Sequence, residues 1–175
     1  MPFTPAHFGP AVFAKSLAPR HLSLTAFACT QVAIDVETLT HRLRHERPVH
    51  RFCHTLVGGS LVGLGVAAAL GLVVAALRRL RAIDDREIAL GLDARSEGSA
   101  EALLWGGFLG GASHAVLDAM VHSDSRPLWP WSDANPWLCP PPVSPILCLL
   151  AGIAGLLIWW IRARARRRAS ASPMR

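Results

Sequence analysis

His50-Arg51-Phe52-Cys53-His54-Thr55 opens an apolar run of 22 residues, Leu56 to Leu77, that only one serine interrupts. A helix of that length crosses the hydrocarbon core of a bilayer. A second polar stretch, Ser113-His114-Ala115-Val116-Leu117-Asp118, lies near the end of another apolar segment, Glu101 to Val121. Two polar motifs at the ends of two apolar helices therefore decide the fold, and they indicate a helical bundle in a membrane.

The composition agrees with a membrane protein. Of the 175 residues, 51% are hydrophobic, and the mean hydropathy is +0.33. Charged residues are concentrated in short blocks between long uncharged segments, as in polytopic membrane proteins. Most of the excess positive charge lies beside the apolar segments and in the C-terminal tail, where arginine sets topology and contacts anionic lipid. We therefore expect membrane lipid as a partner and no nucleic acid.

The expected fold is an all-α, polytopic membrane helical bundle with about three full spans and an N-terminal helical hairpin. The hairpin joins residues 6–18 to residues 22–43 through a turn at 19–21. The spans are Leu56 to Leu77, Glu101 to Val121 and Val143 to Ile161. Residues 1–162 form one membrane domain, and residues 163–175 are expected to be a basic, disordered cytoplasmic tail.

Basic residues predict the topology. The loop at 78–95 and the C-terminal tail hold eleven arginines, whereas the opposite side holds five. Cytoplasmic segments carry the basic excess, so we expect the C-terminus in the cytoplasm. In either orientation, His54 and Asp118 lie on the same side of the membrane. No cleavable signal peptide is predicted, and the four cysteines lack the CxxC pairing of a zinc ribbon or disulfide framework.

The two polar motifs predict a metal site, because ionisable residues at membrane depth are costly and mark function. His50 and His54 are four residues apart, so on a helix both imidazoles project from one face. His114, Asp118 and His122 repeat that spacing in the other motif. If the two spans pack antiparallel, two histidines from one and a His/Asp pair from the other form a ligand shell for zinc or a similar divalent metal.

The N-terminal hairpin brings two further groups to this depth. His7 lies about twelve residues before the turn and Asp35 about fourteen after it. At a rise of about 1.5 Å per residue the two lie at similar heights. We expect them to complete a second metal site or to support the first. Two-metal sites polarise a phosphoryl or acyl oxygen and generate hydroxide from bound water.

Other polar residues have structural interpretations. Glu37 is either a further ligand or a partner of His41, with a preference for the partner. Cys53 is expected to be a packing residue. Three histidines are expected to be capping or interfacial residues: His21, His41 and His45. Three residues of the following loop either bind substrate or terminate turns, and the sequence does not decide between the two: Asp124, Asp133 and Asn135.

The order of these motifs resembles that of the inner-membrane metal-dependent hydrolases of the DUF457 type, which include the LexA-regulated inner-membrane hydrolase. The similar elements are an early histidine, an Asp-x-acid motif at the end of the first long helix, the two polar motifs, and Leu128-Trp129-Pro130 in the loop. The resemblance covers most of residues 1–135. It implies a multi-pass protein of the bacterial inner (plasma) membrane, with metal or catalytic roles for six residues: His7, Asp35, His50, His54, His114 and Asp118.

We therefore predict a membrane metal-dependent hydrolase in which a metal-activated water attacks an ester or phosphoester, with a lipid as one candidate substrate. Zinc is the expected cofactor and manganese the alternative. The expected ligands are His50, His54, His114 and Asp118, supplemented by His7 and Asp35. Asp35 is also the candidate general base, His7 the candidate acid, and Arg51 the candidate anion stabiliser or headgroup anchor.

The alternative is a non-catalytic membrane protein that uses the same His/Asp cluster. One form is a metal or proton carrier, and another is a scaffold subunit whose polar residues lock helices together. A carrier needs a polar path through the bilayer, and the clean segment from Leu56 to Leu77 argues against one. The sequence decides neither the substrate nor the oligomeric state.

Overall fold

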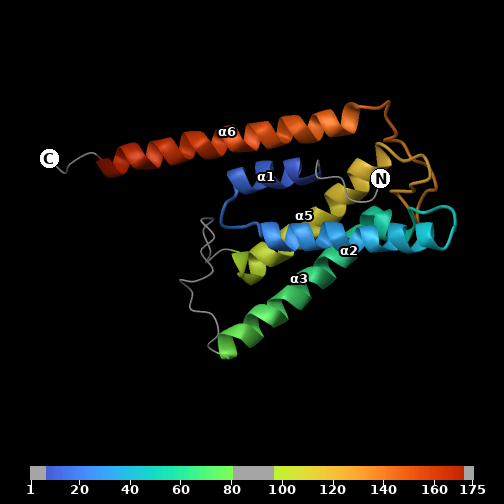
Figure 1. The fold of residues 1–175 in the computed structure, drawn as a ribbon, viewed down its shortest axis with the longest axis horizontal. Helices are drawn as coiled ribbons and strands as arrows, with labels where there is room; N and C mark the ends of the chain where they lie inside the picture. Colours follow the sequence, from blue (N-terminus) through green and yellow to red (C-terminus); the bar gives the residue numbers. More distant parts are fainter. Residues whose placement is uncertain (1–6, 81–96, 172–175) are drawn as a thin grey trace.

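The computed structural model describes residues 7–80 and 97–171. These residues form five α-helices, one short 3-10 helix and no strand, and Figure 1 shows how the α-helices are arranged. The elements are α1 (Phe8–Leu17), α2 (Leu24–Leu43), η2 (Phe52–His54), α3 (Leu56–Arg79), α5 (Ala100–Ala119) and α6 (Val143–Ala171). The described residues thus confirm the all-helical class.

Helix α3 begins where the sequence predicts, because Thr55 caps it. The Thr55 hydroxyl accepts a hydrogen bond from the Gly58 N–H at 2.8 Å, which satisfies one free amide of the first turn. Two helices, α3 and α6 over Val143–Arg168, are long and apolar enough to cross a membrane. The expected third span, α5, is not among them, so the count of three spans plus a hairpin remains a prediction.

Helix α5 is the centre of the bundle and packs on α3 and α2 through glycines. A Cβ added to Gly63 would lie 2.0 Å from the carbonyl oxygen of Gly107, and one added to Gly111 would lie 1.9 Å from that of Gly59. On another face of α5, a Cβ on Gly106 would lie 2.3 Å from a carbonyl oxygen just before α2. Only glycine allows helix backbones to approach so closely.

The order of these contacts gives the helix directions. Gly59 meets Gly111 and Gly63 meets Gly107, so α3 and α5 are antiparallel. Gly106 meets the residue before α2, whereas Gly110 meets Phe27 within it, so α2 and α5 are parallel. Consequently the start of α3, the end of α5 and the end of α2 lie at one end of the bundle (Figure 1). The two polar motifs meet, as predicted.

Helix α6 packs mainly on α1, and Figure 1 shows the two side by side. Gly9 of α1 approaches the carbonyl oxygen of Cys148, and Gly155 of α6 approaches the backbone of Phe13, so these two helices are parallel. Apolar side chains cover the exposed surface of α6, including Leu149, Leu156 and Trp159. This surface suits hydrocarbon.

Helix α6 continues past its apolar part to Ala171. The segment at 163–175, expected to be a disordered tail, is therefore helical as far as residue 171, and its last four residues lie outside the described ones. Most of the arginine-rich loop at 78–95 also lies outside them. The domain division and the cytoplasmic side of the C-terminus stay predictions.

Helix α2 buries several polar residues and exposes large apolar ones. Its buried face includes Thr30, Gln31 and Thr38, beside Phe27 and Ile34. Its exposed large apolar residues are Val32, Val36, Leu39 and Leu43. A helix on the surface of a soluble protein has the opposite arrangement. The outer face of α2 therefore also suits lipid, and its inner face carries polar side chains to the end of the bundle where the two motifs meet.

Candidate metal centre

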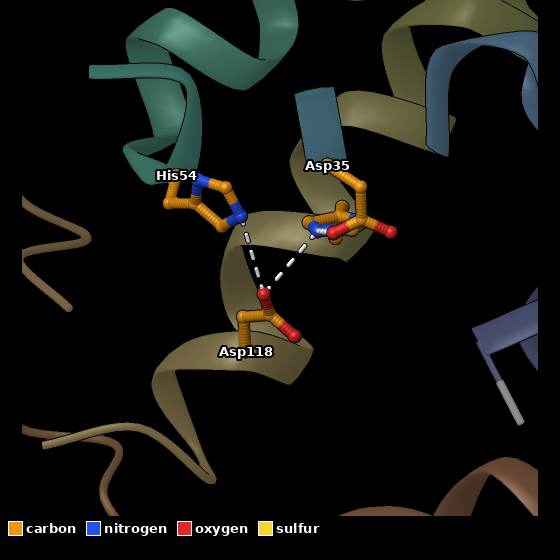
Figure 2. Close-up of side chains that lie close together, drawn as sticks. Asp35, His54 and Asp118 are labelled. Atoms are coloured by element: carbon orange, nitrogen blue, oxygen red, sulfur yellow. Dashed lines mark ion pairs between the residues drawn. The ribbon is translucent and has the colours of Figure 1, made fainter. Parts of the chain in front are cut away.

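Four side chains from three elements converge at this end of the bundle. Asp35 comes from α2, His54 from η2, and His114 and Asp118 from α5. One ligand atom from each lies within 4.8 Å of those of all the others. Figure 2 shows the His54 ring turned toward the Asp118 carboxylate, with the Asp35 side chain nearby. Four ligand atoms this close together can share one metal ion.

Asp118 is the common neighbour of the two imidazoles. Its Oδ2 lies 3.4 Å from His54 Nε2 and 3.3 Å from His114 Nε2. Asp35 Oδ1 lies 3.5 Å from His114 Nε2. His54, His114 and Asp118 are buried, and Asp35 is partly exposed. The centre thus combines two ring nitrogens with two carboxylates, a donor set that zinc and other borderline divalent ions accept.

Hydrogen bonds at the opposite ring nitrogens orient both imidazoles. His54 Nδ1 donates to Glu37 Oε2 at 3.1 Å, since an ionised carboxylate only accepts. His114 Nδ1 donates to Gln31 Oε1 at 2.5 Å. The amide of Gln31 is itself fixed, because its nitrogen donates to the Gly110 carbonyl at 2.9 Å. Both rings therefore direct Nε2 inward, as metal-binding histidines do when a protein group holds the other nitrogen.

The Nε2 atom of His114 tests whether the centre fits a metal. This atom is buried and has no hydrogen-bond partner among the residues that the structure describes. An unsatisfied buried polar atom costs about 1–3 kcal/mol. The carboxylates of Asp35 and Asp118 lie beside it. A divalent cation would satisfy the nitrogen lone pair and neutralise the two carboxylates, so these residues fit a metal ion.

His7 and His50 also lie beside Asp118. His7 Nε2 is 3.7 Å from Asp118 Oδ1, and His50 Nε2 is 3.9 Å from Asp118 Oδ2. The rings of His7 and His114 meet edge to face, with 5.2 Å between their centroids. The hairpin of α1 and α2 thus delivers His7 and Asp35 to the same place, as their distances from the turn predict. Whether His7 and His50 bind metal stays a prediction.

The expected helical pairing of His50 with His54 is wrong. Helix α3 begins at Leu56, His54 ends a 3-10 turn, and His50 lies in the loop before it. Thr55 starts the helix as its cap, so the preceding residues are free to follow another path. The two rings nevertheless meet, with centroids 4.8 Å apart. The loop, and not helical spacing, brings them together.

Glu37 explains the path of the backbone before α3. The expected pair of Glu37 with His41 is also wrong. The Glu37 carboxylate accepts hydrogen bonds from the backbone N–H of Cys53 at 3.0 Å and from His54 Nδ1 at 3.1 Å. His41 instead pairs with Glu46, at 2.7 Å. Glu37 therefore fastens the turn that carries His54, which is the supporting role that a ligand histidine requires.

Arg51 lies outside the group of four. Its Nε donates to the Pro48 carbonyl at 2.9 Å, and its Nη2 lies 3.1 Å from a Glu46 oxygen. The side chain lines a cavity of about 330 Å³ beside the segment that carries His54, together with Pro48, Phe52, Thr55, Arg126 and Trp129. A role for Arg51 at the substrate stays a prediction.

The family model of the YdjM inner membrane protein matches residues 7–173. This range includes every helix and every residue of the centre. The chain belongs to the YdjM inner membrane protein family. The resemblance inferred from the motifs is thereby confirmed. Membership, together with the apolar helices α3 and α6, supports an inner-membrane location. Among curated proteins and among solved structures, no match was found.

The loop after α5 supports the edge of the centre in this YdjM-family protein. Asp124 Oδ1 accepts a hydrogen bond from His50 Nδ1 at 2.8 Å. Asn135 donates to the carbonyls of Ala119 and His122, at 2.8 and 3.1 Å. The third residue left open by the sequence, Asp133, pairs with Arg126 at the surface. Asp124 and Asn135 thus position histidines.

Sequence reasoning missed several supporting residues of α2. Gln31 lies four residues before Asp35, and Thr38 lies three after it, so all three share one helix face. The Thr38 hydroxyl lies 3.1 Å from His54 Nε2, a contact that metal coordination would replace. A polar residue one turn from an expected ligand, on the same face of the helix, was the signal that could have identified both.

Burial and neighbouring charges set the pKa of His50 and of His54, which both precede α3. Burial lowers the pKa of His50, although the hydrogen bond to Asp124 acts in the opposite direction. Burial also lowers the pKa of His54, but the Asp118 and Glu37 carboxylates outweigh this effect and raise it to about 9. His50 is therefore neutral at pH 7 and can act as a ligand, whereas His54 holds a proton that a metal must displace.

Proposed function

We propose that this YdjM-family protein is a membrane-embedded, metal-dependent hydrolase that acts on an ester or phosphoester. The observation that carries the proposal is the convergence of four ligand atoms, from Asp35, His54, His114 and Asp118, within 4.8 Å of one another. The orphaned Nε2 of His114 supports a metal over a self-contained polar network, because such a network would satisfy its own buried atoms.

A divalent ion, zinc or manganese, would supply Lewis acidity and a water of lowered pKa. The chain holds the ion with the two carboxylates and two imidazoles, and Glu37 and Gln31 fix the imidazole orientations. Asp35 is the only one of the four ligands that is partly exposed, which suits exchange of a proton with substrate or solvent. His7, beside Asp118, is the group that we propose to pass this proton to the leaving group. Burial lowers the pKa of His7 to about 4, so its ring is neutral at pH 7 and must accept the proton before it donates it.

The cavity lined by Phe52 and Thr55, on either side of His54 in sequence, supports an amphiphilic substrate. The side chains of Arg51 and Arg126 line it, and guanidinium groups bind phosphate oxygens in a bidentate manner. Phe52 and Trp129 also line it, with ring centroids 6.1 Å apart, and aromatic rings are typical of the membrane interface. We therefore propose a phosphoester of a membrane lipid as the substrate class.

The proposed topology has α5 as a third span beside α3 and α6, with the C-terminus in the cytoplasm. Two observations support it. Three large apolar side chains of α5 are exposed, namely Leu104, Trp105 and Phe108. The arginine-rich segments follow α3 and end α6, where cytoplasmic basic residues are expected. The cluster would then lie near the outer leaflet.

Metal content and hydrolysis, measured on the same preparations, test the proposal. The detergent-purified protein is loaded with zinc or with manganese, freed of excess metal, and assayed by elemental mass spectrometry. Hydrolysis is then measured with a nitrophenyl ester, a nitrophenyl phosphodiester and mixed phospholipid vesicles. We expect bound metal and metal-dependent turnover of a phosphoester in the wild type. Both should be lost in His114→Ala.

His21→Ala is the matched control. His21 is an exposed histidine that pairs with Glu101 at the far end of the bundle, so this variant should keep both metal and activity. A wild-type protein that binds no metal after loading contradicts the proposal at its first step. Bound metal without turnover of any of the three substrates contradicts the hydrolase and favours the non-catalytic alternative.

A further inference from the structure

A second cluster of possible metal ligands lies against the first at this end of the bundle. His50, His122 and Asp118 each offer a ligand atom, and these three atoms lie within 4.8 Å of one another. His50 comes from the loop before η2, and His122 from the turn after α5. Asp118 belongs to both groups. We propose that this second group binds its own divalent metal ion, so that Asp118 is shared between two ions.

The orientation of His50 supports a ligand role. Its Nδ1 donates to Asp124 Oδ1 at 2.8 Å, so the other ring nitrogen carries the lone pair. That nitrogen, Nε2, lies 3.9 Å from Asp118 Oδ2. The backbone N–H of Val49 donates to the other oxygen of Asp124 at 3.0 Å, which fixes this carboxylate. His50 therefore has the same carboxylate support as His54, and a supported histidine is typical of a metal ligand.

The position of His122 is fixed by its backbone, although α5 has already ended at Ala119. Its N–H donates to the Asp118 carbonyl at 2.8 Å, and its own carbonyl accepts from Asn135. Its ring stacks on that of His50, with centroids 4.1 Å apart and an angle of 23° between the planes. Two imidazoles held side by side next to a carboxylate form a donor set for zinc or manganese.

The two groups differ in the number of ligand atoms that they offer. The first offers four and the second three, and each has one partly exposed residue, Asp35 in the first and His122 in the second. An ion in the second group therefore has room for a water or substrate oxygen, which a catalytic site requires. The inference deepens the proposed hydrolase and rests on its first metal site, because a second ion would give it the paired centre common in phosphoester hydrolysis.

Metal stoichiometry tests the second ion independently of activity. The detergent-purified wild type is loaded with Zn²⁺, freed of excess metal and measured by elemental mass spectrometry. We expect two ions per chain in the wild type and one in His122→Phe. Phenylalanine keeps an aromatic ring against His50 but cannot bind a metal, so the loss of one ion would not reflect lost packing. Asp118→Ala should lose both ions, and His21→Ala should keep both.

Manganese gives a second readout. Two Mn²⁺ ions that share a carboxylate are magnetically coupled, so the electron paramagnetic resonance spectrum of the loaded wild type should show a coupled pair. The His122→Phe spectrum should show an isolated ion. One ion in both proteins, with an uncoupled spectrum, overturns the second site and leaves the first intact. Two ions in both also overturns it, since His122 would then not be a ligand. No ion in the wild type overturns the proposed function as well.

Discussion

The two ends of this bundle each bury a polar cluster, and they are built differently. At one end, the Lys15 ammonium donates to Glu97 Oε1 at 2.6 Å and to the Leu22 carbonyl at 2.7 Å. The second oxygen of Glu97 accepts from the Ser23 hydroxyl at 2.9 Å. Donors match acceptors there. At the other end, carboxylates face imidazole nitrogens at 3.3–3.5 Å, and His114 Nε2 has no hydrogen-bond partner.

The comparison separates a structural cluster from a binding cluster. The Lys15–Glu97 pair is complete without any further atom, so it ties the start of α5 to the turn between α1 and α2. The metal centre brings together two carboxylates and the inward ring nitrogens of His54 and His114, which a shared cation would hold together. Burial alone does not distinguish the two. The balance of donors and acceptors does.

The largest expected effect is the loss of metal on removal of the shared ligand. Asp118→Ala should lower the affinity for Zn²⁺ by more than about a hundredfold, the upper end of the loss seen when only a supporting residue is removed. Isothermal titration of the metal-free protein measures the affinity. Lys15→Met is the comparison variant, and it should bind Zn²⁺ as the wild type does. Equal affinities in Asp118→Ala and the wild type would place the metal elsewhere.

Breaking the structural pair should instead reduce stability. Lys15→Met leaves Glu97 buried and unpaired, and loss of one partner of a buried pair costs about 3–5 kcal/mol. Thermal unfolding in detergent, followed by circular dichroism, should show a lower midpoint. The double variant Lys15→Met/Glu97→Gln should recover much of the loss, because no charge is then left alone. A midpoint that the double variant lowers further would show that the pair is not a self-contained unit.

Substitution of a glycine at the contact between α3 and α5 should have the next largest effect, a loss of stability. Gly63→Ala places a Cβ 2.0 Å from the Gly107 carbonyl oxygen, so α3 and α5 must separate, and such overpacking costs about 1–3 kcal/mol. The matched control is Gly65→Ala on the same helix, where an added Cβ meets nothing within 4 Å. The unfolding midpoint should fall in the first variant only. Equal midpoints would mean that the helices adjust freely.

Removal of a supporting residue should weaken the metal centre without destroying it. Glu37→Gln keeps the size of the side chain but loses the charge that orients His54, so Zn²⁺ affinity should fall about ten- to a hundredfold. Glu46→Gln is the control, because Glu46 pairs with His41 and Arg51 in the loop and touches no ligand. If both variants bind Zn²⁺ equally well, the Glu37–His54 contact does not support metal binding.

The smallest effect concerns pH. The pKa of His54 is raised to about 9 in the metal-free protein, since Asp118 and Glu37 outweigh burial. Metal must displace this proton, so Zn²⁺ affinity should rise about tenfold from pH 7 to pH 8 and level off above 9. The metal-free protein should show the opposite trend, losing stability as His54 deprotonates between its ordinary pKa and 9. Affinity independent of pH would show that His54 is not a ligand.

Much of the fold and of the site could be predicted from local signals. The length of the apolar run after Thr55 fixes α3, and the threonine itself fixes its start. Gly106 and Gly110 are four residues apart in α5, a spacing that favours a close partner helix irrespective of the rest of the chain, and the structure packs α2 against both. His54, His114, Asp35 and Asp118 were predicted from the cost of burying each one, and the structure brings all four together.

The rest depended on contacts that no local pattern contains. His50 and His54 were expected on one helix, but Glu37 holds the backbone between these two histidines in a loop and a 3-10 turn. Glu37 was expected to be a ligand or a partner of His41, but the loop after α2 brings His54 to Glu37 and Glu46 to His41. His122 lies four residues after Asp118, which is a helical spacing. Its proposed role as a ligand nevertheless depends on His50, whose ring comes from the loop before η2.

The sequence by itself determined that this chain is helical, that it suits a membrane, and that its costly polar residues lie at helix ends on one side. Hydrophobic length, capping and charge distribution are properties of short segments, so the segments suffice to fix them. Only the tertiary structure decided which ring nitrogen of each histidine faces the centre. It also decided which oxygen atom accepts a hydrogen bond from the other ring nitrogen. Those choices follow from side chains that lie up to 83 positions apart and meet only after α2, α3 and α5 have packed.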